Sequence, residues 1–211
     1  GPQVTIVFVH GLGQTPASWM ETMHYLPKQA NSVCPHLFEL VQGEEVTYER
    51  LYRAFIAYCH QLKAPIHLCG ISLGAILALQ YAIDFPNKVS SLVLIAPRYK
   101  MPRTLLQWQS RLLQCLPSTY FLKSGVEKTT MIQLSRSMQH LNFEKDLRNI
   151  TCPVLVLCGT KDYMNRKACK DIGKRLRNAE TCLIIGAGHE VNQQSPQELA
   201  KVLRAFYEKT I

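Results

Sequence analysis

The sequence predicts an α/β protein with a doubly wound, mostly parallel sheet of six strands and one inserted helical segment. Strand and helix patterns alternate along nearly the whole chain, which is typical of parallel strands joined by helices. The strand patterns are continuous apolar runs, as expected for a sheet covered by helices on both faces. One stretch, residues 98–148, breaks the alternation and shows helical spacing alone.

The predicted strands are apolar runs bounded by turn residues, and they lie near 4–9, 34–40, 65–69, 89–95, 153–158 and 180–185. The predicted helices lie roughly at 17–29, 47–61, 73–84, 165–177 and 196–209. Pro86 ends the third of them, because proline and the residue before it resist continuation of a helix. At 24.0 kDa we expect one core, formed by residues 1–97 and 149–211, with residues 98–148 inserted into it.

The most informative motif is Gly70-Ile71-Ser72-Leu73-Gly74, which stands between a strand pattern and a helical pattern. A G-x-S-x-G sequence at such a corner is typical of a nucleophile elbow. The turn leaves little room for a Cβ at either glycine, and it strains the serine so that its hydroxyl points outward. The motif predicts Ser72 as a nucleophile, with the Leu73 N–H free at the helix N-terminus, where negative charge is favoured.

A serine hydrolase also needs an acid and then a histidine, each just beyond a strand. Asp162 follows the apolar run 154–158, and His189 follows the run 181–185. Upstream, a strand pattern ends in His10-Gly11-Leu12-Gly13, and this turn is expected to supply a second oxyanion-hole N–H, from Leu12. The alternatives are a helix-capping serine, a turn aspartate and a surface histidine. We expect His10 to be a structural part of its turn.

With H-G-x-G, G-x-S-x-G, G-x-x-D and G-x-G-H in order over most of its length, the chain resembles the α/β-hydrolase fold family. The resemblance implies a triad of Ser72, Asp162 and His189 that acts through an acyl-enzyme without a cofactor. It also implies a reduced α/β-hydrolase sheet, without the two leading strands of larger members, and a cap formed by the insertion.

Leucines and methionines recur at helical spacing within residues 98–148. A helical cap with these side chains on its inner surface would shape an apolar acyl pocket. The candidate pocket residues are Trp108, Leu112, Met131 and Met138. The alternative is that they only pack the cap helices onto the core, as the apolar stripe of an amphipathic helix usually does.

The net charge of +9 is concentrated in the insertion, where residues 98–148 carry nine basic and three acidic side chains. Residues 1–97 carry five and six. A basic cap beside a pocket would attract anionic substrates or make peripheral contact with an anionic lipid surface. The alternative is a solvated face. Nothing in the sequence resembles a nucleic-acid-binding module.

Hydrophobic residues make up 47% of the chain and charged residues 18%, which argues against disorder. We see no signal peptide and no apolar run that could span a bilayer, and Gly1-Pro2 is typical of a cleaved tag. The eight cysteines form no C-x-x-C pair, and three lie in apolar strand patterns. We therefore expect reduced thiols, a cytoplasmic location and no metal site.

The expected function is hydrolysis of a carboxylic ester of a small or medium acyl group, with a monoacylglycerol-like lipid or a thioester among the candidate substrates. One alternative is a lyase or C–C hydrolase for a carboxylated metabolite, which Arg103, Arg111 and Arg136 would suit. An iminopeptidase-type aminopeptidase would need acidic groups that the insertion largely lacks. A slow-turnover ligand sensor on the same fold stays open as well.

Overall fold

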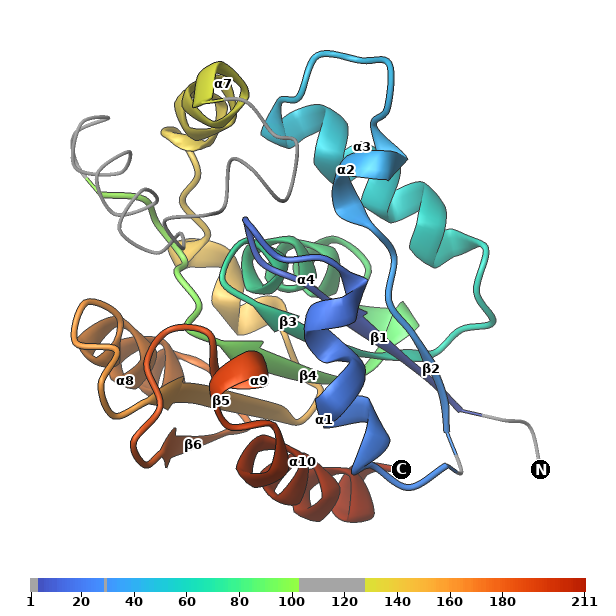
Figure 1. The fold of residues 1–211 in the computed structure, drawn as a ribbon, viewed down its shortest axis with the longest axis vertical. Coiled ribbons are helices and arrows are strands. Elements are labelled where there is room, and N and C mark those ends of the chain that lie inside the picture. The colour runs from blue at the N-terminus through green and yellow to red at the C-terminus, as the bar shows by residue number, and fades with distance from the viewer. Residues whose placement is uncertain (1–3, 29, 103–127) are drawn as a thin grey trace.

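The computed structural model describes residues 4–28, 30–102 and 128–211 (Figure 1). Within them one sheet has the strand order β2-β1-β3-β4-β5-β6, and every neighbouring pair is parallel. The strands are β1 (Thr5–Val9), β2 (Asn31–Val33), β3 (Ile66–Ile71), β4 (Val89–Ile95), β5 (Val154–Gly159) and β6 (Ala179–Ile184). The predicted class, a doubly wound parallel α/β sheet, is confirmed.

Helices connect the strands and cover both faces of the sheet. The α-helices are α1 (Met20–His24), α2 (Leu37–Leu40), α3 (Tyr48–His60), α4 (Leu73–Asp84), α7 (Lys128–Met138), α8 (Arg166–Arg175), α9 (Val191–Gln194) and α10 (Pro196–Thr210). The 3₁₀ helices are η1 (Pro16–Trp19), η2 (Pro86–Lys88) and η3 (Glu144–Asn149). Figure 1 shows α1, α9 and α10 on one face of the sheet, while α3, α4 and α8 pack on the other.

Alternate residues of the central strands β1, β3, β4 and β5 supply the two apolar cores. In β1, Ile6 and Phe8 pack with the helices α1 and α10, whereas Val7 and Val9 pack with α3 and α4. All four are at most 3% exposed. The sequence of a strand buried on both faces is therefore a continuous apolar run. Successive side chains point to opposite faces, but no alternation of polar and apolar residues remains when both faces contact an apolar core.

The direction of winding reverses between β1 and β3. From β1 the chain passes to β2 on one side, then crosses to β3 on the other. In sheets of this kind, ligands bind in the crevice outside the carboxyl ends of the strands at such a reversal. The turn after β1 holds residues 10–14 and the turn after β3 holds Ser72, so the topology brings these two segments together.

The strand predicted at 34–40 is wrong. The strand at this position is the three-residue β2, Asn31–Val33, and Leu37–Leu40 forms the short helix α2. Pro35 has no N–H for a ladder, and the Leu37 N–H is taken by the Nε2 atom of His10 at 3.1 Å. The helix predicted at 17–29 is also shorter, since η1 and α1 together end at His24.

An isolated antiparallel bridge joins the segment after β4 to the segment before η3. Lys100 bridges Asn142, the Phe143 N–H donates to the Tyr99 carbonyl at 2.7 Å, and the Met101 N–H donates to the Leu141 carbonyl at 3.3 Å. Helix α7 precedes the second segment of this bridge, and the Ser137 hydroxyl accepts a hydrogen bond from the Tyr48 N–H of α3 at 2.8 Å. Helix α7 is thus held against α3.

Candidate active site

Ser72 stands at the corner between β3 and α4. Its φ of 56° and ψ of −116° lie in a region that L-residues rarely adopt, and its N–H donates to the Ile95 carbonyl at 2.9 Å. A Cβ on Gly70 would collide with the Gly74 carbonyl, and a Cβ on Gly74 would collide with the Val9 carbonyl. The packing therefore holds the serine in a strained conformation, as the G-x-S-x-G motif predicts.

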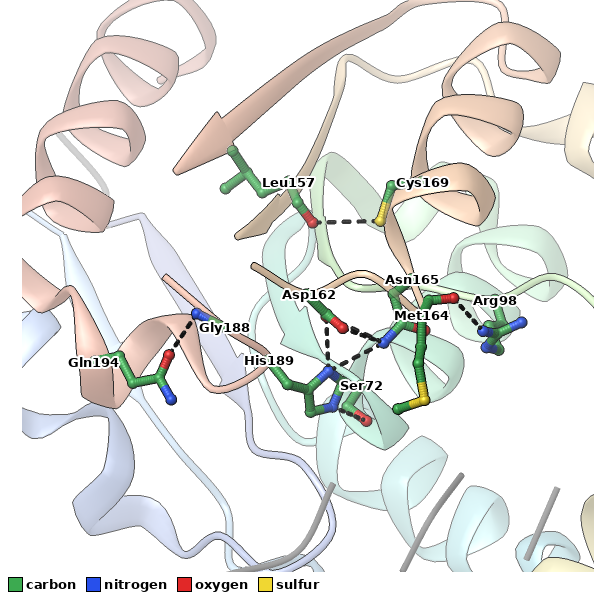
Figure 2. A network of polar contacts seen from close by, with 10 residues as sticks. All are labelled: Ser72, Arg98, Leu157, Asp162, Met164, Asn165, Cys169, Gly188, His189 and Gln194. Carbon is green, nitrogen blue, oxygen red and sulfur yellow. Dashed lines mark hydrogen bonds and ion pairs between the residues drawn. The ribbon is translucent and has the colours of Figure 1, made fainter. Parts of the chain in front are cut away.

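His189 joins Ser72 to Asp162 by one hydrogen bond from each ring nitrogen. Its Nε2 lies 3.1 Å from the Ser72 Oγ and its Nδ1 lies 2.9 Å from the Asp162 Oδ2 (Figure 2). The His189 side chain is 17% exposed and that of Asp162 is 3% exposed. The structure brings the three predicted residues together, with the carboxylate buried and the imidazole partly exposed.

The turns that carry Asp162 and His189 are bonded to each other. The Lys161 N–H donates to the Ala187 carbonyl at 2.8 Å, and the Gly186 N–H donates to the Thr160 hydroxyl at 2.9 Å. A Cβ on Gly159 would collide with the Ala187 carbonyl. The glycine in G-x-x-D is thus required by the close approach of the histidine turn.

Asn165 is a site residue that the sequence analysis missed. It is 5% exposed, and its Nδ2 lies 2.9 and 3.1 Å from the two carboxylate oxygens of Asp162 and 3.2 Å from the Nδ1 of His189 (Figure 2). Since the imidazole Nδ1–H faces Asp162, the amide N–H groups serve the carboxylate and stabilise its charge. The signal available in the sequence was an asparagine three residues after the aspartate. In the structure the two residues share one turn, in which the Asn165 N–H donates to the Asp162 carbonyl.

The turn after β1 is held by His10. The Nε2 of His10 accepts from the Leu37 N–H, so its Nδ1 carries the proton and donates to the Gly11 carbonyl at 2.8 Å. His10 is 0% exposed, and burial lowers its pKa to about 4. A neutral imidazole with both nitrogens bonded to backbone has no part in proton transfer, in agreement with the expected structural role.

The Gly11 carbonyl also sets the direction of the next N–H. It accepts from His10 and from the Gln14 N–H, at 3.1 Å. Because the peptide group is planar, the Leu12 N–H points away from these two donors. A Cβ placed on Gly11 would lie 3.3 Å from the Ser72 Cβ, so the turn runs directly beside the serine.

Leu12 and Leu73 supply N–H groups without a protein acceptor. Among residues 4–28, 30–102 and 128–211, neither backbone N–H has a hydrogen-bond partner. Leu73 is the first residue of α4, whose N-terminus favours negative charge. Two unpaired donors, one next to Ser72 in the chain and one on the neighbouring turn, suit an oxygen that gains negative charge.

The predicted pocket residues fall into two groups. Trp108 and Leu112 lie outside the described residues. Met131 and Met138 lie on α7 at 3% and 1% exposure, in one apolar cluster with residues of α3 and α4. They pack onto the core as the alternative interpretation states, and a contact with substrate stays a prediction.

The described residues also bear on metals, membranes and thiols. They contain no cluster of three or more His, Cys, Asp or Glu side chains arranged for a metal ion. None of the helices found among them combines the length and the hydropathy needed to cross a bilayer. The seven cysteines in this part of the chain are all free thiols.

A parallel sheet with a serine after β3, an aspartate after β5 and a histidine after β6 is typical of the class of α/β hydrolases. A family model described as "Alpha/beta hydrolase family" matches residues 6–202. The chain belongs to the alpha/beta hydrolase family.

Curated relatives and a solved structure extend this assignment. Monoacylglycerol lipase ABHD6 of Homo sapiens is 23% identical over 260 residues, which cover 98% of this chain and 76% of that protein. The (E)-2-((N-methylformamido)methylene)succinate hydrolase of Acinetobacter baylyi is 19% identical, over 97% of this chain and 90% of that protein. A thermophilic esterase of Thermogutta terrifontis, solved with malate bound, superimposes with a TM-score of 0.79 at 18% identity, over 100% of this chain and 91% of that one.

Proposed function

We propose that this chain is a serine hydrolase that cleaves a carboxylic ester of a small or medium acyl substrate through an acyl-enzyme intermediate. The observation that carries the proposal is the hydrogen-bonded chain Ser72–His189–Asp162, with the serine in a strained backbone conformation. A serine hydroxyl is a weak nucleophile at neutral pH and needs a base within hydrogen-bond reach. The Nε2 of His189 is at that distance.

In the first half-reaction, His189 takes the proton of Ser72 as the Oγ attacks the ester carbonyl carbon. Asp162 holds the imidazole with its Nδ1 proton inward and stabilises the imidazolium that forms. The tetrahedral oxyanion lies between the N–H groups of Leu12 and Leu73, each of which contributes about 3 kcal/mol to its stabilisation. When the intermediate collapses, His189 gives its proton to the leaving alcohol.

In the second half-reaction, His189 takes a proton from water as the water oxygen attacks the acyl carbon. Collapse of the second tetrahedral intermediate breaks the bond to the Ser72 Oγ, which regains the proton from His189. The free acid leaves. The cycle is balanced with water as the only co-reactant.

The substrate class is proposed from the relatives and from the insertion. Proteins named monoacylglycerol lipase and esterase are among those similar to this chain. We place the cap at residues 98–148 and the apolar side of the acyl pocket at Trp108, Leu112, Met131 and Met138. The excess of basic residues in this segment supports contact with anionic substrates or an anionic lipid surface, and the free thiols support a cytoplasmic location.

The test is turnover of p-nitrophenyl esters from acetate to palmitate by the wild type and by Ser72→Ala. We expect multiple turnovers with a maximum at one chain length and loss of activity in the variant. Ser90→Ala, on β4 near the opposite end of the sheet, is the matched control and should keep wild-type activity. A fluorophosphonate should label Ser72 alone, as mass spectrometry of the peptides reads directly.

Three results would count against the proposal. Labelling of a residue other than Ser72 would show that Ser72 is not the nucleophile. A single burst followed by arrest would favour the slow-turnover sensor. A folded wild type that labels at Ser72 but turns over no ester would favour the alternative substrate, a carboxylated metabolite cleaved at another bond.

A further inference from the structure

A buried pair of amides links the turn after β1 to the helix that follows His189. The Nε2 of Gln14 donates to the Oδ1 of Asn192 at 2.9 Å, and the Nδ2 of Asn192 donates to the Oε1 of Gln14 at 3.2 Å. Gln14 is 4% exposed and Asn192 is 0% exposed. The two amides therefore satisfy each other away from solvent, at a sequence separation of 178 residues.

On its own side, Gln14 holds both polar groups of Gly11. Its side-chain Oε1 accepts from the Gly11 N–H at 3.1 Å, and its backbone N–H donates to the Gly11 carbonyl at 3.1 Å. The peptide that contains this carbonyl also contains the Leu12 N–H, so fixing one end fixes the direction of the other. Gln14 thus orients the N–H that the proposed mechanism uses for the oxyanion.

On the other side, Asn192 belongs to α9, which begins two residues after His189. The Asn192 carbonyl accepts from the Thr22 hydroxyl at 3.3 Å. Gln194, on the same helix, accepts from the Gly188 N–H at 2.6 Å, directly before the histidine (Figure 2). Helix α9 is therefore bonded through one amide to the oxyanion turn and through another to the histidine turn.

We infer that Gln14 and Asn192 are positioning residues, which keep the Leu12 N–H in register with His189 and Ser72. This inference rests on the proposed function. Because both side chains are buried and bonded to each other, neither is placed to touch substrate. Two apolar residues would fill the same space and leave no amide unpaired, but they would leave the buried Gly11 N–H without its acceptor. The amides fix the position and direction of the Leu12 N–H, and a catalytic site needs such groups placed to within a fraction of an ångström.

The experiment compares Gln14→Leu, Asn192→Leu and the double variant with the wild type. Gln14→Leu leaves the Asn192 amide buried without its partner, and Asn192→Leu leaves the Gln14 Nε2 with the Gln193 Oε1 at 3.4 Å in place of Asn192, so each single variant should lower the Tm. The double variant removes both amides together and should recover part of the loss seen in Gln14→Leu, since the buried Gly11 N–H still lacks its acceptor. If the pair positions the turn, the double variant still shows kcat reduced about 30-fold with KM within about twofold, since the effect falls on the transition state. Gln197→Leu, an exposed amide on α10, is the matched control.

Hydrogen exchange at the Gly11 amide gives a readout that does not depend on catalysis. NMR of the ¹⁵N-labelled full chain should show exchange at this amide at least about tenfold faster in the double variant, because its acceptor is gone. Amides in α10 should be unchanged.

The outcomes separate this inference from the proposed function. A double variant that regains both Tm and kcat would overturn the positioning role and leave the pair purely structural. A reduced kcat with partly recovered Tm and fast Gly11 exchange would support it. If the wild type neither labels with fluorophosphonate nor turns over any ester, the proposed function fails first. Unchanged Gly11 exchange would then overturn the positioning role, whereas faster exchange would show that the pair holds this turn.

Discussion

Two turns beside Ser72 each carry a histidine just beyond a strand end, yet the two imidazoles are in opposite situations. His189 is partly open, and its ring nitrogens face a hydroxyl and a carboxylate. His10 is fully buried, and its ring nitrogens face a backbone N–H and a backbone carbonyl. The partners of His189 can stabilise both its neutral and its protonated ring, whereas the partners of His10 stabilise only the neutral ring.

The difference shows that the partners of a histidine, rather than its place after a strand, decide what it can do. Asp162 can compensate an imidazolium. Around His10 there is no carboxylate partner among the described residues, so protonation would put an uncompensated charge in an apolar interior. His10 orients the peptide that contains the Leu12 N–H, whereas His189 moves the proton in the proposed mechanism.

The most direct test of this difference between the two histidines is the same substitution, His→Leu, in both turns. His189→Leu should lower kcat about 10⁵-fold and change the unfolding free energy by less than about 1 kcal/mol, because the ring is partly exposed and on a turn. His10→Leu should cost about 2 kcal/mol of unfolding free energy, since it leaves the buried Leu37 N–H without an acceptor. Its activity should stay far above that of His189→Leu. Ester turnover and urea unfolding measure both quantities.

If His10→Leu were as inactive as His189→Leu while still folded, the two turns would share the chemistry and the division of roles would be wrong. His24→Leu, at an exposed position on α1, is the control for loss of an imidazole. It should leave both quantities near wild type.

A second prediction concerns acid. Burial lowers the pKa of His10 to about 4 and that of His67, whose Nδ1 lies 2.6 Å from the Ser91 hydroxyl, to about 4. In the unfolded chain both titrate near 6.5. Between these values the unfolded state binds protons that the folded state does not, so stability is fully present above pH 6.5 and is lost as the pH falls toward 4. The loss is of the order of 3 kcal/mol for each ring.

Urea unfolding at several pH values between 8 and 4 measures this slope. His67→Gln should make it shallower by about half. A slope that does not respond to His67→Gln would mean that this imidazole takes up its proton in the folded chain.

The sequence was sufficient for those parts of the site that depend on neighbours in the chain. Ser72, Asp162 and His189 follow apolar runs and stand next to glycines that the backbone requires, so order and local pattern locate them. Five of the six strands and the helices α3, α4, α8 and α10 follow from the same patterns. The position of β2 does not, because Pro35 ends the ladder and a contact from His10 favours a helical turn at Leu37.

The parts that were missed depend on pairs far apart in the sequence. No local pattern shows that Gln14 meets Asn192, since an amide is compatible with a loop as well as with a buried pair. The methionines of α7 illustrate the reverse case. Helical spacing predicts an apolar face correctly, but only packing shows that Met131 and Met138 lie in one cluster with α3 and α4.

The smallest predicted effect sharpens the account of the histidine turn itself. Asn165→Ala removes the N–H groups that lie 2.9 and 3.1 Å from the Asp162 oxygens, while the bond from Asp162 to His189 remains. We expect kcat to fall about tenfold with little change in KM, since the carboxylate is less well oriented and the imidazolium less well stabilised. Asn142→Ala, whose Oδ1 accepts from the Glu144 N–H in an exposed turn, is the matched control and should keep full activity. A rise in KM with kcat unchanged would contradict the orienting role. It would indicate that Asn165 contacts the substrate and does not orient Asp162, so the turn of the proposed acid would also belong to the substrate-binding surface.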